Sequence, residues 1–247
     1  MVSVARSEGP RRIVAVDLAR SVALLGMAAF HFTWDLEFFG HVAPGTTLHG
    51  GWEIFARLVA SSFLFLAGLS LVLAHGDGIR WRGFLRRLAM VVPAALAITA
   101  ATFAAMREAF IFFGILHSIA VASVLGLLFI RAPVWLTLAA AAGVWFLPEV
   151  VRFPAFDPRW LAWTGLAETS PPSFDFVPVF PWFAATLLGI ATARAGEAAG
   201  LWDRLRGGTP GPLLSTAAWP GRHSLAVYLI HQPVLIGLVW LWTRATG

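Results

Sequence analysis

The sequence predicts an all-α fold: a polytopic membrane helix bundle of about seven transmembrane helices, forming a single integral-membrane domain over residues 1–247. Three observations predict it. Hydrophobic residues make up 58% of the chain and charged residues only 13%, roughly half the ~25% charged share of a typical soluble domain. Several apolar runs reach the ~20 residues that a helix needs to cross about 30 Å of hydrocarbon. All 18 basic residues are arginine, and most lie in short segments between these runs.

Each predicted helix is bounded by residues typical of loops or of the water phase. The first follows a basic segment, the second a glycine-rich stretch, and the third the sequence GDGIRWRG. The fourth and fifth follow MRE and RA, the sixth a proline-rich stretch, and the seventh the sequence WPG. These signals predict helices over 13–38, 52–75, 84–106, 109–131, 133–149, 178–196 and 222–243. We expect the first helix to be retained and not to be cleaved as a signal peptide.

The arginines predict the orientation, because cytoplasmic loops carry an excess of basic residues. With the N-terminus in the cytoplasm and the C-terminus outside, the inner side holds Arg6, Arg11, Arg12, Arg80, Arg82, Arg86, Arg87, Arg131, Arg194, Arg204, Arg206 and Arg222. The outer side holds Arg107, Arg152, Arg159 and Arg244. The expected location is the bacterial cytoplasmic (inner) membrane, with membrane lipid as a partner. Because this orientation explains the positive charge, no nucleic-acid partner is expected.

Two outer segments are candidates for a functional role. Residues 39–51 form a glycine-rich segment with His41 and His49, and residues 150–177 are rich in proline and tryptophan. Such a long segment is either a functional lid or an interfacial linker with tryptophans at headgroup level. The chain has no cysteine, which excludes disulfides and thiolate metal sites, and no metal site is predicted.

Polar residues form a stripe along the first helix, in DLARSVALLGMAAFHFTWD (17–35). Asp17, Arg20, His31 and Asp35 recur at intervals that place them on one helical face. Ionisable groups inside a membrane segment are costly, so they are functional candidates by default. For Asp17 and Arg20, the alternative is an ion pair that only stabilises the end of the helix.

Further histidines lie on other predicted segments. His31 lies about 16 Å beyond Arg20 along the helix, and His49 stands before the second helix, where Glu53 and Arg57 are expected to pair. His117 lies on the fourth helix, and His231 lies on the seventh with Tyr228 on the same face. A single intramembrane histidine can also serve only as a hydrogen bond between helices.

These residues carry a family resemblance. The sequences AVDLARSVALLGMAAFHFTWDL, LHGGWEIFARLVASSFLFLAGLSLVLA, FGILHSIAVASVLGLL, DFVPVFPWFAATLLGIA and GRHSLAVYLIHQPVLI resemble the heparan-α-glucosaminide N-acetyltransferase family, especially its short bacterial members. Arg20 and His31 also look like the Arg/Lys-x10-His signature of the acyltransferase-3 group. The resemblance implies transfer of an acyl group from cytoplasmic acyl-CoA, with acetyl-CoA as the expected co-substrate, to a sugar or glycan outside. It implies no tightly bound cofactor.

The resemblance also implies roles for residues. The family's active-site histidine corresponds to His49, and the acyltransferase-3 histidine to His31, so both are expected to be catalytic. Animal relatives carry asparagine at the position of His31 and commonly glutamine at that of His117. Asp17 and Arg20 are expected to bind acyl-CoA, helped by the arginines of 80–87. The residues expected to support or orient the catalytic groups, or to stabilise the oxyanion, are Asp35, His117, Asp175, Tyr228 and His231.

Several alternatives stay open at this level. Either histidine could act as a base in direct transfer, or one could carry the acyl group. The acceptor could be a hydroxyl or an amine, and the sequence does not predict the oligomeric state. Two other classes compete with the enzyme: a haem-binding membrane protein and a transporter subunit.

Overall fold

The computed structural model describes residues 12–206 and 210–246, and within these ranges it is a bundle of α-helices without β-strands. Five helices are long and apolar enough to cross a membrane: α1 (Val14–Phe38), α2 (Gly50–His75), α3 (Trp81–Ala105), α7 (Val179–Ala198) and α11 (Ser224–Thr246). Two shorter apolar helices, α4 (Ile115–Gly126) and α5 (Val134–Val150), complete the bundle. The all-α membrane fold is therefore confirmed.

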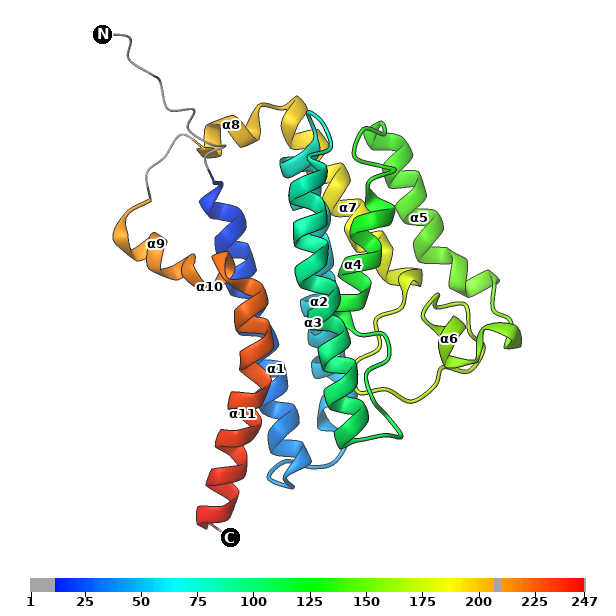
Figure 1. The fold of residues 1–247 in the computed structure, drawn as a ribbon, viewed down its shortest axis with the longest axis vertical. Coiled ribbons are helices and arrows are strands. Elements are labelled where there is room, and N and C mark those ends of the chain that lie inside the picture. Colours follow the sequence, from blue (N-terminus) through cyan, green and yellow to red (C-terminus); the bar gives the residue numbers. More distant parts are fainter. Residues whose placement is uncertain (1–11, 207–209, 247) are drawn as a thin grey trace.

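The first and last helices set the two ends of the bundle, because α1 begins and α11 ends at opposite ends (Figure 1). We call the end where α1 begins the arginine end and the other the far end. Many arginines that the sequence assigned to the inner side lie at the arginine end, in or beside the short helix α8 (Leu201–Arg206), the α2–α3 turn and α10 (Trp219–Arg222). Arg6 and Arg11 lie outside the described residues. The other short helical segments are η1 (Thr46–Leu48), η2 (Pro154–Phe156), α6 (Arg159–Ala162) and α9 (Pro212–Ala217).

The predicted helix boundaries hold within a few residues except for the fourth helix, where the prediction of 109–131 is wrong at both ends. Before Ile115, the backbone leaves the helix to bond to the segment preceding α7: Phe174 N donates to Ala109 O (3.0 Å), and Val177 N to Phe113 O (3.1 Å). Because these bonds join segments far apart in sequence, apolar periodicity could not reveal them. The seventh helix begins at Ser224, after the separate turn of α10, and extends to Thr246.

The centre of the bundle is the crossing of α2 and α7. A Cβ atom on Gly68 would lie 2.0 Å from Thr186 O, and one on Gly189 would lie 2.0 Å from Phe65 O. The two backbones therefore approach through paired glycines, as small residues permit in membrane helices. The side chains of Leu64, Leu187 and Ile190, on the same two helices, are fully buried.

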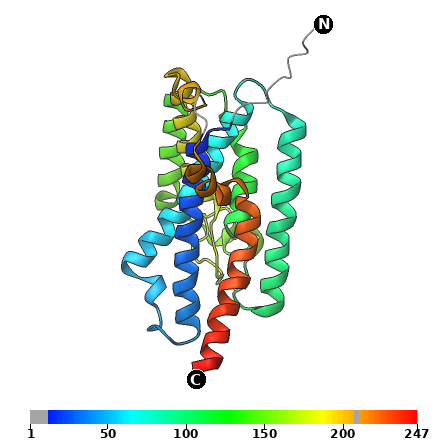
Figure 2. The ribbon, with the colours of Figure 1, turned by 90° about the vertical axis from the view of Figure 1, so that its left-hand side faces the viewer.

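A second layer is formed by α1 with α10 and α11, which lie beside each other in both views (Figures 1 and 2). Gly221 of α10 packs directly on α1: its N–H donates to Ser21 Oγ (2.9 Å), and a Cβ there would meet Asp17 O at 1.9 Å. Along α11, large apolar residues such as Ile230, Leu238 and Leu241 are exposed, as expected for a lipid-facing surface.

Candidate functional site

An arginine-lined cleft opens at the arginine end between α1, α2, α8 and α10. Its volume is about 370 Å³, within the ~300–1,000 Å³ range of small-molecule sites. The residues that line it are Arg12, Ile13, Val16, Asp17, Arg20, Ser70, Leu73, Ala74, Arg80, Arg206 and Arg222. Five of these residues are arginines. Arg20 pairs with Asp17, and Arg206 pairs with Asp203, so the remaining positive charge favours an anionic ligand.

Arg20 is held in place at the wall of this cleft. Its Nη1 lies 2.8 Å from Asp17 Oδ1, and its Nη2 donates to Ser70 Oγ of α2 at 2.5 Å. The predicted Asp17–Arg20 pair is thus present, and Arg20 also ties α1 to α2. Because both guanidinium contacts are made by the protein, Arg20 is fixed before any ligand arrives.

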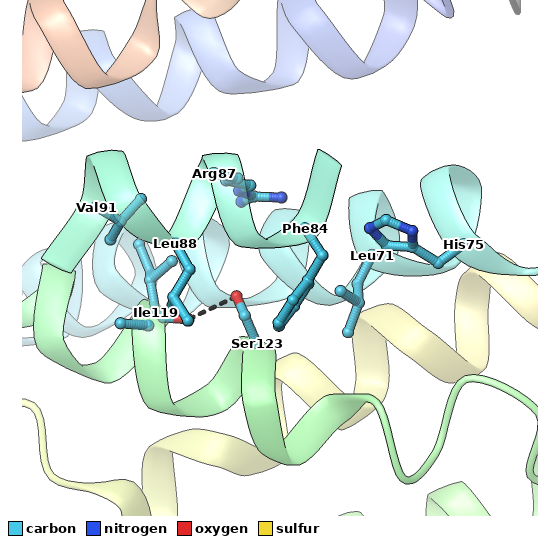
Figure 3. A pocket seen from close by; sticks show the side chains of 9 residues that line it. Leu71, His75, Phe84, Arg87, Leu88, Val91, Ile119 and Ser123 are labelled. Carbon is cyan, nitrogen blue, oxygen red and sulfur yellow. Dashed lines mark hydrogen bonds between the residues drawn. The ribbon is translucent and has the colours of Figure 1, made fainter. Parts of the chain in front are cut away.

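Arg87 extends the positive charge onto α3. Figure 3 shows Phe84 and Leu88 pointing toward Ser123 and Ile119 of α4, while Arg87 lies on the side of α3 away from Ser123. The void among these side chains is only about 10 Å³, which is room for about one water. This void is therefore too small for a ligand larger than a water molecule.

Deeper along α1, His31 meets His231 of α11. Their ring centroids lie 5.0 Å apart, and the Tyr228 ring lies near His231 with a centroid separation of 5.6 Å. Nδ1 of His231 lies 2.5 Å from Tyr228 O, so Nδ1 must carry the proton and Nε2 of the neutral ring is an acceptor. The structure thus brings together His31 and His231, two of the histidines that the sequence marked as candidates.

Asp35 lies one turn beyond His31 and is fully buried. The sequence indicated that Asp35 could orient His31, but its Oδ1 accepts a hydrogen bond from Gln232 Nε2 at 2.7 Å. Within residues 12–206 and 210–246, Asp35 Oδ2, His231 Nε2 and Gln232 Oε1 are buried without a hydrogen-bond partner. Buried polar atoms are normally satisfied, so these three atoms are candidates for contact with a ligand.

His117 and Asp175 form a separate polar group at the start of α4. Asp175 Oδ2 accepts a hydrogen bond from Ile115 N (2.9 Å), while the His117 ring lies 3.2 Å from Thr99 Oγ1 and 3.3 Å from Gly114 N. This group therefore joins the α3–α4 connection to the segment before α7. Tyr228 packs against buried apolar residues of α3 and α4, such as Ala95 and Leu116.

The Asp175 carboxyl should make stability depend on pH. Its burial raises the pKa from 3.8 to about 6, although the hydrogen bond from Ile115 N acts in the opposite direction. A folded-state pKa above the unfolded value means that the protonated form stabilises the fold. This contribution is fully present below about pH 4 and is lost as the pH rises through about 6.

We therefore expect the thermal unfolding midpoint of the wild type to decrease as the pH is raised from 4 to 7. Asp175→Asn cannot ionise and keeps an oxygen that can accept the hydrogen bond from Ile115 N, so it should flatten that fall. The measurement is thermal unfolding of both proteins from pH 4 to 8. An unchanged slope in the variant would exclude Asp175 as the source.

His49 lies on the loop between α1 and α2. It is exposed and precedes α2 in extended conformation, on the loop that follows α1. Glu37 holds this loop: its two carboxylate oxygens accept hydrogen bonds from Gly45 N (2.5 Å), Thr47 N (2.8 Å) and Thr47 Oγ1 (2.8 Å). Gly45 has a φ of 84°, a conformation that glycine adopts readily. The predicted Glu53–Arg57 pair is present further along α2.

Several residues of these groups were not predicted. Ser70 joins the arginine cleft, Gln232 pairs with Asp35, and Glu37 holds the His49 loop. Of these three, Gln232 could have been found from the sequence, because it is a polar residue next to His231 in an apolar helix. Within the described ranges, no three His, Asp or Glu side chains gather as the ligands of a metal ion would.

Comparison with known families favours the acyltransferase over a haem-binding protein or a transporter subunit. The model of the family described as heparan-alpha-glucosaminide N-acetyltransferase, catalytic, matches residues 12–233. The chain belongs to this family. No curated protein and no solved structure matches the chain significantly. The family match covers every helix from α1 to α10 and α11 as far as Pro233, so it includes the arginine cleft and the His31–His231 pair.

As a member of this family with five helices long enough to cross a membrane, the chain is assigned to the membrane acetyltransferases. The match shows no link to the acyltransferase-3 group, so the roles of Arg20 and His31 under that signature stay predictions. The family match does not identify the donor, the acceptor or the side of the membrane on which each binds.

Proposed function

We propose that this protein transfers an acetyl group from cytoplasmic acetyl-CoA to an amino sugar on the outer face of the bacterial inner membrane. The observation that carries the proposal is the arrangement of α1. One face of this helix presents an arginine-lined cleft at one end and a half-buried histidine pair about 16 Å further along. That arrangement suits a donor with an anionic head and a reactive group on a long arm.

The arginine cleft supports the donor part of the proposal. The phosphates of acetyl-CoA would contact the arginines of the cleft, and the pantetheine arm would run along α1 toward His31. Arginine binds phosphate oxygens with paired N–H groups, and Arg20 is already oriented by Asp17 and Ser70. With the arginine end in the cytoplasm, as the excess of arginine favours, the cleft faces the compartment that contains acyl-CoA.

His31 is the proposed base for the acceptor. It takes a proton from the nitrogen of the acceptor, whose lone pair forms the new C–N bond to the acetyl carbon. The C–S bond then breaks, and the CoA thiolate takes up a proton to leave as the free thiol. His231 lies against His31 and, with Tyr228, is proposed to keep the ring in place. Direct transfer of this kind needs no acyl-enzyme.

His49 is proposed to act on the acceptor side. It is exposed on the loop after α1, and Glu37 holds that loop in place. A sugar that approaches from outside would therefore pass His49 before it reaches His31 and His231. Asp175 and His117, at the start of α4, are proposed to support the wall of the bundle next to Tyr228.

Replacement of Arg20 tests the donor site. Arg20→Gln removes the charge and is expected to weaken acetyl-CoA binding by about 10- to 100-fold, because a charge-assisted hydrogen bond contributes about 1.5–3 kcal/mol. Binding would be measured on protein in nanodiscs, together with release of CoA in the presence of glucosamine. Arg244→Gln, on an arginine in the last turn of α11, is the control and should leave binding unchanged. Equal affinities of wild type and Arg20→Gln would contradict the proposed donor site.

A further inference from the structure

The buried polar group between α1 and α11 contains three acceptor atoms with no donor. Six buried side-chain atoms lack a hydrogen-bond partner in the described parts of the chain, and three of them belong to Asp35, His231 and Gln232. We call Asp35 Oδ2, His231 Nε2 and Gln232 Oε1 the acceptor triad. Its residues are coupled: His231 and Gln232 are adjacent on α11, and Gln232 is bonded to Asp35.

With Asp35 ionised, each member of the triad accepts a hydrogen bond. Gln232 turns its NH₂ group to Asp35 Oδ1; the opposite orientation would set its oxygen against the carboxylate, so Oε1 is the free atom. His231 uses Nδ1–H for Tyr228 O, which leaves Nε2 of the neutral ring with a lone pair. The ionised carboxylate of Asp35 accepts only. The ligand that satisfies these atoms must therefore be rich in N–H or O–H donors.

The charge of Asp35 further restricts the class of ligand that could bind. Asp35 is fully buried, and among residues 12–206 and 210–246 no arginine forms an ion pair with it, because the arginines that pair do so with Asp17, Glu53, Glu197 and Asp203. A buried carboxylate without a cation is costly. A ligand that carries both positive charge and several donors removes both costs at once, and a primary ammonium group has three N–H donors and one positive charge.

We propose that the acceptor triad binds the primary ammonium group of the acetyl acceptor and thereby selects an amine over a hydroxyl. This inference rests on the proposed function and deepens it, because it names the residues that determine the acceptor. The ammonium enters the triad next to His31, which contacts His231. One N–H proton passes to His31 to free the lone pair, and a second leaves as the C–N bond forms and the thiolate departs as the thiol. A hydroxyl offers one donor and no charge, so it leaves most of the triad unsatisfied.

The test uses Asp35→Asn, which keeps the shape of the side chain and removes its charge. Two measurements are made on the full chain in nanodiscs: the shift in the unfolding midpoint caused by glucosamine or glucose, and the KM for glucosamine in the release of CoA. For the wild type we expect a shift with glucosamine and none with glucose. Asp35→Asn should lose that shift and raise the KM about 10- to 100-fold, the factor expected for a hydrogen bond to a charged group.

Two further variants separate the inference from loss of the fold. Gln232→Leu should weaken glucosamine binding in the same way, whereas acetyl-CoA should still bind both variants with wild-type affinity. Thr33→Ala is the matched control on α1, because Thr33 Oγ1 bonds to Ala29 O of its own helix; it should behave as the wild type.

The outcomes distinguish the inference from the proposed function. Equal shifts or equal turnover with glucose and glucosamine would overturn the inference while leaving the acyltransferase intact. A shift with sodium chloride equal to that with glucosamine would identify a metal-cation site and would also overturn it. A glucosamine-specific shift that Asp35→Asn abolishes, without any release of CoA, would support the triad and contradict the proposed function.

Discussion

Replacing His31 with alanine is expected to lower the release of CoA from acetyl-CoA and glucosamine by about 10²- to 10⁴-fold, the usual contribution of a general base. The reason is that His31 lies on the same face of α1 as the arginine cleft, with its ring centroid 5.0 Å from that of His231. The measurement is steady-state release of CoA in nanodiscs. Binding of acetyl-CoA should be unchanged, since Arg20 lies about three turns and Asp17 about four turns away.

His49→Ala provides the contrast. His49 is exposed on the loop before α2, so its loss should raise the KM for the acceptor more than it lowers kcat. If His49→Ala abolishes turnover while His31→Ala retains it, the assignment of the base is reversed. Accumulation of an acyl-enzyme in a burst experiment would instead favour the two-step route over direct transfer.

Replacing Gly68 with alanine is expected to destabilise the fold by about 3 kcal/mol or more, at or above the upper end of ordinary overpacking. The added Cβ would lie 2.0 Å from Thr186 O, and a backbone atom cannot rotate away as a side chain can. The helices α2 and α7 would have to separate at the centre of the bundle. The lowered stability would be measured in detergent by thermal or denaturant unfolding.

Gly143→Ala is the matched control for this effect. Gly143 also lies within a helix, α5, but a Cβ there meets nothing within 4 Å. Alanine should therefore be neutral or stabilise the helix by about 0.5–1 kcal/mol, because glycine lowers helix stability by that amount. Equal stability of the Gly68→Ala and Gly143→Ala proteins would contradict the close approach of α2 and α7.

The sequence by itself predicted the class of fold and the polar face of α1. Apolar runs long enough to span a membrane are a local property of the chain, and five helices of this kind are present. The polar stripe also follows from local spacing, and Asp17, Leu24, Met27 and Asp35 are indeed buried on one face. The ion pair of Glu53 with Arg57 could be predicted for the same reason, because i and i+4 residues are neighbours on any helix.

Only the tertiary structure decided which polar groups meet. Asp35 and Gln232 are 197 positions apart, and nothing in the spacing of either helix specifies that α1 and α11 pack together at that depth. The same limit explains why the fourth helix was predicted too long: the segment before it is held by bonds to the segment before α7. Helical periodicity indicates which face of a helix is buried, whereas the partner of that face depends on packing between distant segments. That packing placed His31 beside His231 and left His49 on an exposed loop.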